Sequence, residues 1–179
     1  GENMKDQNQN GQDLARSNTA YISQLALEHG YIEGISLKHY DLRAANLDGV
    51  TFKNVDFSHA NLSGANLSEA KFIACNFEES CLIDTCFCES VFENCNFGNA
   101  RFGATDICYA EMRDCNFAGL STFSLNFIAL RKLENCKLHH EGETIAFNQA
   151  PIAIQGVLNT PCVLIGSKIL LGQKVFERD

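Results

Sequence analysis

Basic residues and nucleotide-binding motifs are scarce in this chain of 179 residues. It has 14 lysines and arginines against 22 aspartates and glutamates, so its formal net charge is −8. A chain of this charge without a basic patch repels phosphate, and direct binding to nucleic acid is therefore not expected. A glycine-rich phosphate loop is also missing, and no serine or cysteine nucleophile has an assigned base. We therefore expect a protein that is not an enzyme and uses no cofactor.

Long apolar runs are missing as well. No stretch is long enough to span a bilayer, and the first residues lack the charged, apolar and small-residue order of a secretory signal. A basic amphipathic helix that could lie on a membrane surface is not present either. The expectation is a cytoplasmic protein that does not associate with membranes.

Cys-x-x-Cys pairs are absent, although the chain has nine cysteines. The odd total and the expected cytoplasmic location favour free thiols over disulfides. Cys88 and Cys108 are twenty residues apart and are expected to point outward, and Cys81 and Cys86 stand where Asn or Asp is usual in the repeat described below. A zinc site, with four thiolates meeting at one corner, is an alternative. The missing pairs at zinc-ligand spacing count against it.

What the chain does have is a hydrophobic period of five. From Leu37 to Phe127 every fifth residue, here called the centre of a unit, is Leu, Phe, Ile or Met, except for Thr122. Two places before the centres, every fifth residue from Ala45 to Cys115 is Ala, Val, Cys, Ser or Thr. Helices and ordinary strands have other periods. The pattern predicts a coiled repeat in which a large and a small residue of each unit point inward.

Several units also share a residue pattern, as in the segments 45–49 (ANLDG), 60–64 (ANLSG), 65–69 (ANLSE) and 75–79 (CNFEE). These segments resemble the A(D/N)LXX unit of the pentapeptide-repeat proteins. The resemblance implies an all-β solenoid, a right-handed quadrilateral β-helix of about five coils in which four units make one square coil of twenty residues. Stacking then buries an apolar face that no single unit can bury alone.

The chain is predicted to divide into four parts. Residues 1–11 are polar and expected to be disordered, with the remnant of a tag before Met4. Residues 12–34 form an N-terminal helical cap, residues 35–138 form the β-helix, and residues 139–179 form a C-terminal β cap or dimerisation tail.

The helical cap is expected to cover the open first coil, which would otherwise expose its core and its unpaired backbone groups. Ser17 or Asn18 is the predicted N-cap, and Gly30 is the predicted stop. The apolar face of the helix is predicted to comprise Ala20, Ile22, Leu25 and Leu27.

The end of the repeat is irregular. After Phe127 the register slips by one residue, because Leu133 and Leu138 resume the step of five. The tail then carries three predicted β-segments, which begin at Pro151, Pro161 and Lys168 and are separated by glycine and asparagine. A homodimer formed through this tail is a hypothesis.

The predicted core is a column of leucine and phenylalanine side chains. Its leading members are Leu47, Leu67, Phe72, Phe77, Phe87, Phe92, Phe97 and Phe102. Cys75, Cys95 and Cys115 are twenty residues apart at the small inward position, so we expect a buried stack of thiols. Asn76, Asn96 and Asn116 are also twenty apart, and we assign them to hydrogen bonding at a corner.

One side of the predicted coil is acidic. Counting units in fours places Leu47, Leu67, Phe87 and Ile107 on this side, which carries no Lys or Arg before the register slips. Its predicted outward acids are Asp48, Glu69, Glu89 and Asp106. An acidic ribbon on a rigid rod can imitate the phosphate line of duplex DNA and attract proteins that hold DNA through Lys and Arg. Acids on an exposed sheet also serve solubility.

The family resemblance implies a partner, because pentapeptide-repeat proteins include DNA mimics that engage type II topoisomerases, notably DNA gyrase. The leading hypothesis is therefore a protein that binds a DNA-handling enzyme through its acidic side. The alternative is an interaction scaffold, similar to those in bacterial effectors or encoded by a phage, which binds a partner through its flat faces or its tail.

A second metal hypothesis concerns His39, His59 and Glu79, which are twenty residues apart in one column. Two imidazoles and a carboxylate could hold a metal and leave one position open. Corner residues of a β-helix also alternate among polar types without any ligand. We favour this second interpretation and predict no metal site.

Overall fold

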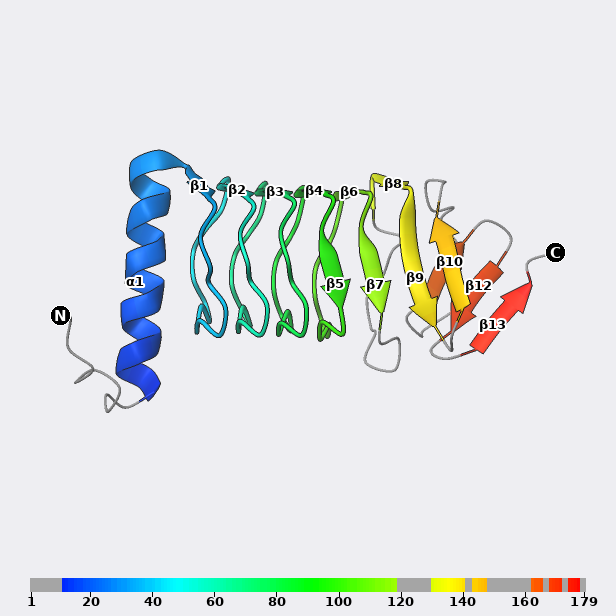
Figure 1. Ribbon diagram of the computed structural model, residues 1–179, viewed down its shortest axis with the longest axis horizontal. Helices are drawn as coiled ribbons and strands as arrows, with labels where there is room; N and C mark the ends of the chain where they lie inside the picture. The colour runs from blue at the N-terminus through cyan, green and yellow to red at the C-terminus, as the bar shows by residue number, and fades with distance from the viewer. Residues whose placement is uncertain are drawn as a thin grey trace.

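The computed structural model describes residues 11–118, 130–140, 143–147, 162–165, 168–171 and 174–177, with side chains for residues 20–117 and 130–137. Helix α1 (Gly11–His29) lies across one end of a stack of coils, and a group of β-strands lies at the other end (Figure 1). No described helix is both long enough and apolar enough to cross a membrane.

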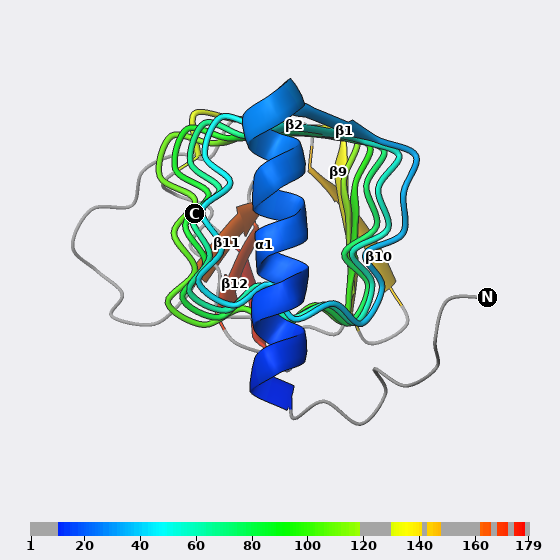
Figure 2. The ribbon, with the colours of Figure 1, turned by 90° about the vertical axis from the view of Figure 1, so that its left-hand side faces the viewer.

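The stack of coils is a parallel β-solenoid of about five turns, as predicted. One side is a six-stranded parallel sheet made of β1 (Tyr31–Glu33), β2 (Thr51–Lys53), β3 (Lys71–Ile73), β4 (Val91–Glu93), β6 (Glu111–Arg113) and β8 (Lys132–Glu134). Single bridges between residues twenty apart continue the ladder on the other sides, as between Asp41 and Asn61 or between Asn46 and Asn66. Seen along the axis, the coils superimpose in a four-sided outline (Figure 2).

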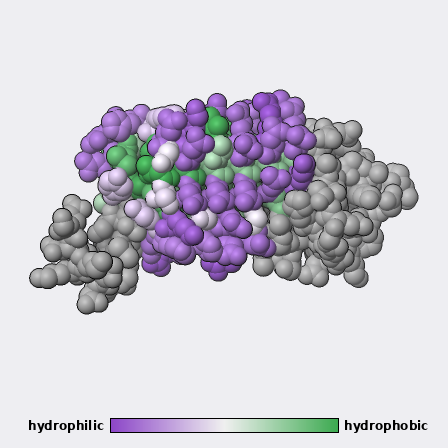
Figure 3. All heavy atoms as spheres, viewed as in Figure 1, coloured by the Kyte–Doolittle hydropathy of each residue, from purple (hydrophilic) through white to green (hydrophobic). Residues whose placement is uncertain are grey.

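A second sheet leads from the repeat into the tail. Its strands are β5 (Asn96–Gly98), β7 (Asn116–Ala118), β9 (Cys136–His140) and β10 (Glu143–Phe147). The pairing is parallel up to β9, and β10 is antiparallel to β9. Figure 3 shows the side of the molecule on which β5 and β7 lie, where a band of hydrophobic residues runs between hydrophilic ones.

The tail is rich in β-structure, as predicted. Strands β11 (Cys162–Ile165), β12 (Lys168–Leu171) and β13 (Lys174–Glu177) form an antiparallel meander. The sequence from Lys168 onward was predicted as one segment and is in fact two antiparallel strands. The segment predicted from Pro151 lies outside the described residues, as do residues 1–10, and the four domain boundaries remain predictions.

The helical cap confirms its predicted end but not its predicted start. Gly30 has a φ of +60°, and its amide donates to the Ala26 carbonyl over 2.8 Å, as in helices that end in a left-handed glycine. The helix begins at Gly11, so Ser17 and Asn18 lie inside it and the predicted N-cap is wrong.

The apolar face of the helix is narrower than predicted. Ile22 is buried and Leu25 is partly buried, whereas Ala20 is exposed and Leu27 is 88% exposed. Helical spacing predicts which residues lie on one face of the helix. How much of that face is buried depends on its contact with the first coil.

The centres fill the inside of the coil. All eight predicted core residues are buried, and phenylalanine rings one coil apart lie nearly parallel, as with Phe57 and Phe77 at a centroid distance of 4.9 Å. The small positions from Ala45 to Cys115 are buried too, except for the partly buried Thr105. Where they carry hydroxyls, these donate to backbone carbonyls, as Thr85 Oγ1 does to Leu62 O over 2.8 Å. Polar residues are therefore tolerated in the core because their hydrogen bonds are made.

The stack of cysteines is present and extends by one member. Cys75, Cys95, Cys115 and Cys136 are buried, and each thiol donates to backbone carbonyls, as Cys95 Sγ does to Phe72 O over 3.6 Å. Burial raises the pKa of the Cys95 thiol well above its usual value. This thiol therefore stays protonated, as a small hydrophobic residue of the core would require.

The predicted register slip is also present. Met112 pairs with Leu133, one residue further along than the step of twenty that pairs Phe92 with Met112. Leu130 is buried while Arg131, which stands at the small position, is exposed. The centres Thr122 and Phe127 lie outside the described residues.

Candidate protein-binding face

The acidic face comprises the units 45–49, 65–69, 85–89 and 105–109, one from each of four successive coils. Backbone hydrogen bonds fix the register between coils: Leu67 N donates to Cys86 O over 2.8 Å, and Phe87 N donates to Asp106 O over 2.7 Å. Outward residues of this face therefore stand in three columns, before the centre, after the centre, and at the corner.

The structure brings the four predicted acids onto this face but does not align them in one ribbon. Glu69 and Glu89 are neighbours in the corner column, where both have left-handed backbone (φ 57° and 58°). Asp48 lies in the column after the centre, and Asp106 lies in the column before it. All four residues are exposed. Counting by fives finds the correct side but not the column.

Charge on this face is not compensated. Its four units contain no Lys or Arg, and among the described side chains none of the four acids makes an ion pair. Some acids on other sides are paired: Asp41 Oδ2 lies 2.6 Å from Arg43 Nη2, and Glu134 Oε2 lies 3.0 Å from Arg113 Nε. The hydrogen bond from Arg43 lowers the pKa of Asp41.

Hydrogen bonds from asparagine side chains hold the backbone of the acidic face in place. Asn66 Nδ2 donates to Asn46 Oδ1 over 3.2 Å, and Asn66 Oδ1 accepts the Ser68 amide over 3.1 Å. On another side, Asn96 Nδ2 donates to Asn76 Oδ1 over 3.3 Å, as predicted for the stacked asparagines. The face is therefore a fixed surface rather than a set of independent loops.

The predicted column of His39, His59 and Glu79 is present as a stack of polar side chains. The rings of His39 and His59 lie 5.0 Å apart at an angle of 29°, and His59 Nδ1 lies 3.1 Å from Glu79 Oε2. Among the described residues, the ligand atoms of His39, His59 and Glu79 do not gather closely enough to hold one ion.

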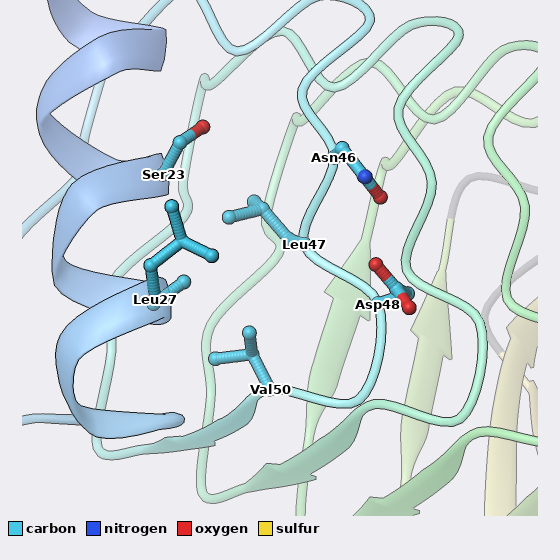
Figure 4. Close-up of a pocket in the computed structure, with 7 residues that line it drawn as sticks. Ser23, Leu27, Asn46, Leu47, Asp48 and Val50 are labelled. Atoms are coloured by element: carbon cyan, nitrogen blue, oxygen red, sulfur yellow. The ribbon is translucent and has the colours of Figure 1, made fainter.

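A cavity of about 240 Å³ lies between α1 and the first coil, at the helix end of the acidic face. Figure 4 shows Ser23 and Leu27 on the helix opposite Leu47 and Val50, with Asn46 and Asp48 further from the helix. This cavity follows from incomplete cover by the cap, which no sequence pattern signalled.

A family model described as pentapeptide repeats, in eight copies, matches residues 35–72 and 52–88. Residues 35–88 are pentapeptide repeats, and this part of the chain belongs to the pentapeptide-repeat family. The matched residues supply about half of the coils, and the coils that follow keep the same step of twenty residues up to the slip before β8.

No curated protein sequence matches this pentapeptide-repeat chain. Among solved structures it is similar to a trypsin-treated form of QnrB1, described as a plasmid-mediated fluoroquinolone resistance protein, with 16% identity and a TM-score of 0.40. That match covers 61% of this chain and 65% of QnrB1, so this chain spans less than two thirds of that relative. The pentapeptide-repeat protein Rfr23 of the cyanobacterium Cyanothece 51142 matches with 14% identity and a TM-score of 0.49, over 65% of this chain and 97% of Rfr23.

Two cysteines depart from the pentapeptide-repeat unit on the acidic face. Cys86 stands where Asn46 and Asn66 stand in the same column, and Cys88 follows it across the buried centre. Ligand atoms of Cys86, Cys88 and Asp106 all lie within 4.8 Å of one another. Partial burial, followed by hydrogen bonding with Asp106, raises the pKa of the Cys88 thiol to about 12.

Sequence reasoning missed this cluster because it looked for zinc ligands close together along the chain. The signal that would have found it is a Cys-x-Cys at 86–88 followed twenty residues later by an Asp-x-Cys at 106–108. In a coil of twenty residues, Cys86 lies next to Asp106 and Cys88 lies next to Cys108, so the four residues form two adjacent pairs on neighbouring coils.

Proposed function

We propose that this pentapeptide-repeat protein is a non-enzymatic binding protein whose acidic face occupies the DNA-binding surface of a DNA-handling enzyme. The observation that carries the proposal is the distribution of basic residues. Each of the other three sides of the coil holds Lys or Arg, whereas Asp48, Glu69, Glu89 and Asp106 share a face that has neither. A surface of this kind attracts Lys and Arg on a partner and steers their approach.

The charge spacing suits a mimic of DNA. Hydrogen-bonded strands are about 4.8 Å apart, so the four acids extend over about 14 Å. One strand of B-DNA presents a phosphate about every 3.4 Å, a comparable number of charges over that length. Because the coils are held by backbone ladders, binding would order few groups, which keeps the entropic cost of association low.

The partner class follows from the same surface. Enzymes that hold duplex DNA present arrays of Lys and Arg, and a type II topoisomerase such as DNA gyrase is the first candidate, as the family resemblance implies. We further propose a cytoplasmic location. In support, the eight cysteines whose side chains are described are all free, as is usual in a reducing compartment.

The test is direct binding to purified gyrase, with cytosol pull-down as a wider search. The acidic-face variant carries Asp48→Asn, Glu69→Gln, Glu89→Gln and Asp106→Asn. A matched control removes the same charge from other sides through Glu78→Gln, Asp84→Asn, Glu93→Gln and Glu111→Gln. We expect the first variant to lose binding and the control to keep it, with both unfolding cooperatively near the wild-type midpoint.

The salt dependence of binding and a comparison of the two variants test the role of the acidic face. Binding to the acidic face should weaken steeply as salt rises, because it depends on charge. A partner that both variants retain equally would overturn the acidic face as the site. It would also transfer the search to the flat faces and the tail, where truncation after Leu138 and measurement of the oligomeric state test the scaffold and the homodimer.

A further inference from the structure

The cluster of Cys86, Cys88 and Asp106 has the placement of a ligand set. Cys86 and Cys88 flank the buried Phe87, and both are partly exposed, so both side chains lie at the outside of the coil. Asp106 is the bridge partner of Cys86 on the next coil. The backbone ladder therefore holds three potential ligands within 4.8 Å of one another.

Packing does not explain why Cys86 stands there. At equivalent positions before the centre, an Asn or Asp oxygen accepts the amide two residues further on, as Asn66 Oδ1 does from Ser68 over 3.1 Å and Asp106 Oδ1 does from Cys108 over 3.0 Å. Among the hydrogen bonds of the described residues, none joins the Cys88 amide to the Cys86 side chain. The side-chain hydrogen bond that joins Asn66 to Asn46 is not repeated between Cys86 and Asn66. The Sγ atom of Cys86 instead lies 3.1 Å from Ser68 Oγ.

We propose that Cys86, Cys88 and Asp106 bind one zinc ion on the acidic face. Two thiolates and a carboxylate are ligands that zinc accepts in tetrahedral sites, at about 2.3 Å to sulfur and about 2.0–2.2 Å to oxygen. Those lengths place ligand atoms roughly 3.5–3.8 Å apart, which small side-chain rotations reach from the observed cluster. Cys108 follows Cys88 in the same column and is the nearest candidate for the fourth ligand.

The surroundings favour a cation at this place. The two thiols are partly buried and Asp106 is exposed, so an ion can enter from solvent. Glu69 and Glu89 stand at the adjacent corner, and the acidic face concentrates cations. As zinc binds, the two thiol protons pass to solvent and two thiolates remain on the metal. Hydrogen bonding from the Cys108 amide orients the carboxylate of Asp106, as supporting contacts do around metal ligands.

The experiment is a cobalt titration of the full chain, reduced and freed of metal. Tetrahedral Co²⁺ bound to thiolates gives a near-ultraviolet charge-transfer band and visible d–d bands. We expect both to saturate at about one equivalent and to disappear when Zn²⁺ is added. The key variant is Cys86→Asn, because Asn46 and Asn66 occupy the same column on the two preceding coils and asparagine should fold at least as well as cysteine there. It should weaken cobalt binding at least tenfold.

Cys81→Asn is the matched control. Cys81 also replaces an asparagine at the position before a centre, but it lies on another side of the coil and in no such cluster among the described residues. This variant should keep the bands and the affinity. Zinc should also raise the unfolding midpoint of the wild type and of Cys81→Asn, but not of Cys86→Asn.

The proposal is overturned if the wild type shows no thiolate-to-cobalt band, or if the band survives in Cys86→Asn combined with Cys88→Ser. The result does not depend on the proposed partner. Cys86→Asn leaves all four carboxylates of the acidic face in place, so loss of metal binding and loss of partner binding are separate outcomes.

Discussion

The rings of Phe72 and Phe92 lie nearly parallel one coil apart, with centroids 4.8 Å apart and an interplanar angle of 7°. Phe52 lies on the other side of Phe72 at 5.2 Å and 5°. These separations are close to the spacing of about 4.8 Å between hydrogen-bonded strands. The distance between stacked rings therefore matches the distance between hydrogen-bonded coils. A change in one would disturb the other.

The first prediction concerns the middle of this stack. Phe72→Ala should lower the free energy of unfolding by about 3–5 kcal/mol, because it removes a fully buried ring and leaves a cavity between the rings of Phe52 and Phe92. Urea unfolding followed by circular dichroism measures the change. Phe72→Leu keeps most of the volume and should cost clearly less. A loss below about 1 kcal/mol for the alanine variant would show that neighbouring coils collapse into the space.

The second prediction concerns the corners. Ala74 has a φ of 53°, a left-handed conformation that costs an L-residue about 1–2 kcal/mol, whereas Gly64 adopts φ 71° without that cost. Ala74→Gly should therefore stabilise the protein, by up to about 1 kcal/mol after the greater freedom of glycine in the unfolded chain is subtracted. Gly64→Ala should destabilise it by a similar amount, although its new Cβ would meet only ordinary contacts.

Thermal and urea unfolding of the two single variants and of the double variant check this pair. The corners are far enough apart in the coil for the two effects to be close to additive. Changes of the same sign in both single variants would rule out backbone strain as the cause.

The third prediction concerns pH. Arg43 hydrogen-bonds to Asp41 and holds the pKa of that carboxyl below its usual value of 3.8. A carboxyl whose pKa is lower in the folded state contributes stability above its unfolded pKa and loses it as the pH falls through its folded pKa. Asp41→Asn should therefore cost up to about 1 kcal/mol near pH 7, since the pair is partly exposed.

The same substitution should cost progressively less as the pH falls below 3.8. Unfolding measured at pH 7 and at pH 3 tests this, and salt should reduce the difference at pH 7. Arg43→Gln is the companion variant and should abolish most of the effect of Asp41→Asn. A difference that is equal at both pH values would show that the ion pair is not its source.

The repeat itself was predictable from the sequence, because its period acts on every residue. The step of five places Phe72 and Phe92 in one column and Cys75 beside Cys95, and the late slip brings Leu133 opposite Met112. Each of these follows from backbone pairing alone, so no side-chain geometry was needed.

What the period could not predict depends on contacts between elements or on the exact place of a side chain within a unit. Leu27 has helical spacing like Ile22, yet only Ile22 meets the first coil. Glu69 and Asp106 share a side but not a column. Cys86 and Asp106 form a cluster because residues twenty apart lie side by side on adjacent coils. Metal-ligand motifs of closely spaced residues, such as Cys-x-x-Cys, do not include such a pair.

The fourth prediction asks whether the acidic face serves stability. Glu69 and Glu89 are neighbours in the corner column, and the amide of Glu69 bonds to the carbonyl of Cys88, which places the two corners one coil apart. Two like charges about 5 Å apart in water repel by less than about 1 kcal/mol. Glu69→Gln should therefore raise the free energy of unfolding by up to that amount at low salt. The gain should vanish near 1 M salt, where the screening length is about 3 Å.

Glu111→Gln is the control, because Glu111 stands between Val91 and Lys132 in its own column and has no acidic neighbour there. It should bring no gain. Adding Glu89→Gln to Glu69→Gln should bring less than Glu69→Gln alone, since the repulsion is already gone. If the expected gain is found, the acids of this face reduce the stability of the fold, so stability does not account for their presence. Partner binding then gains support as their role. If Glu69→Gln lowers stability at low salt instead, the carboxylates hold the coil together and the case for a DNA mimic weakens accordingly.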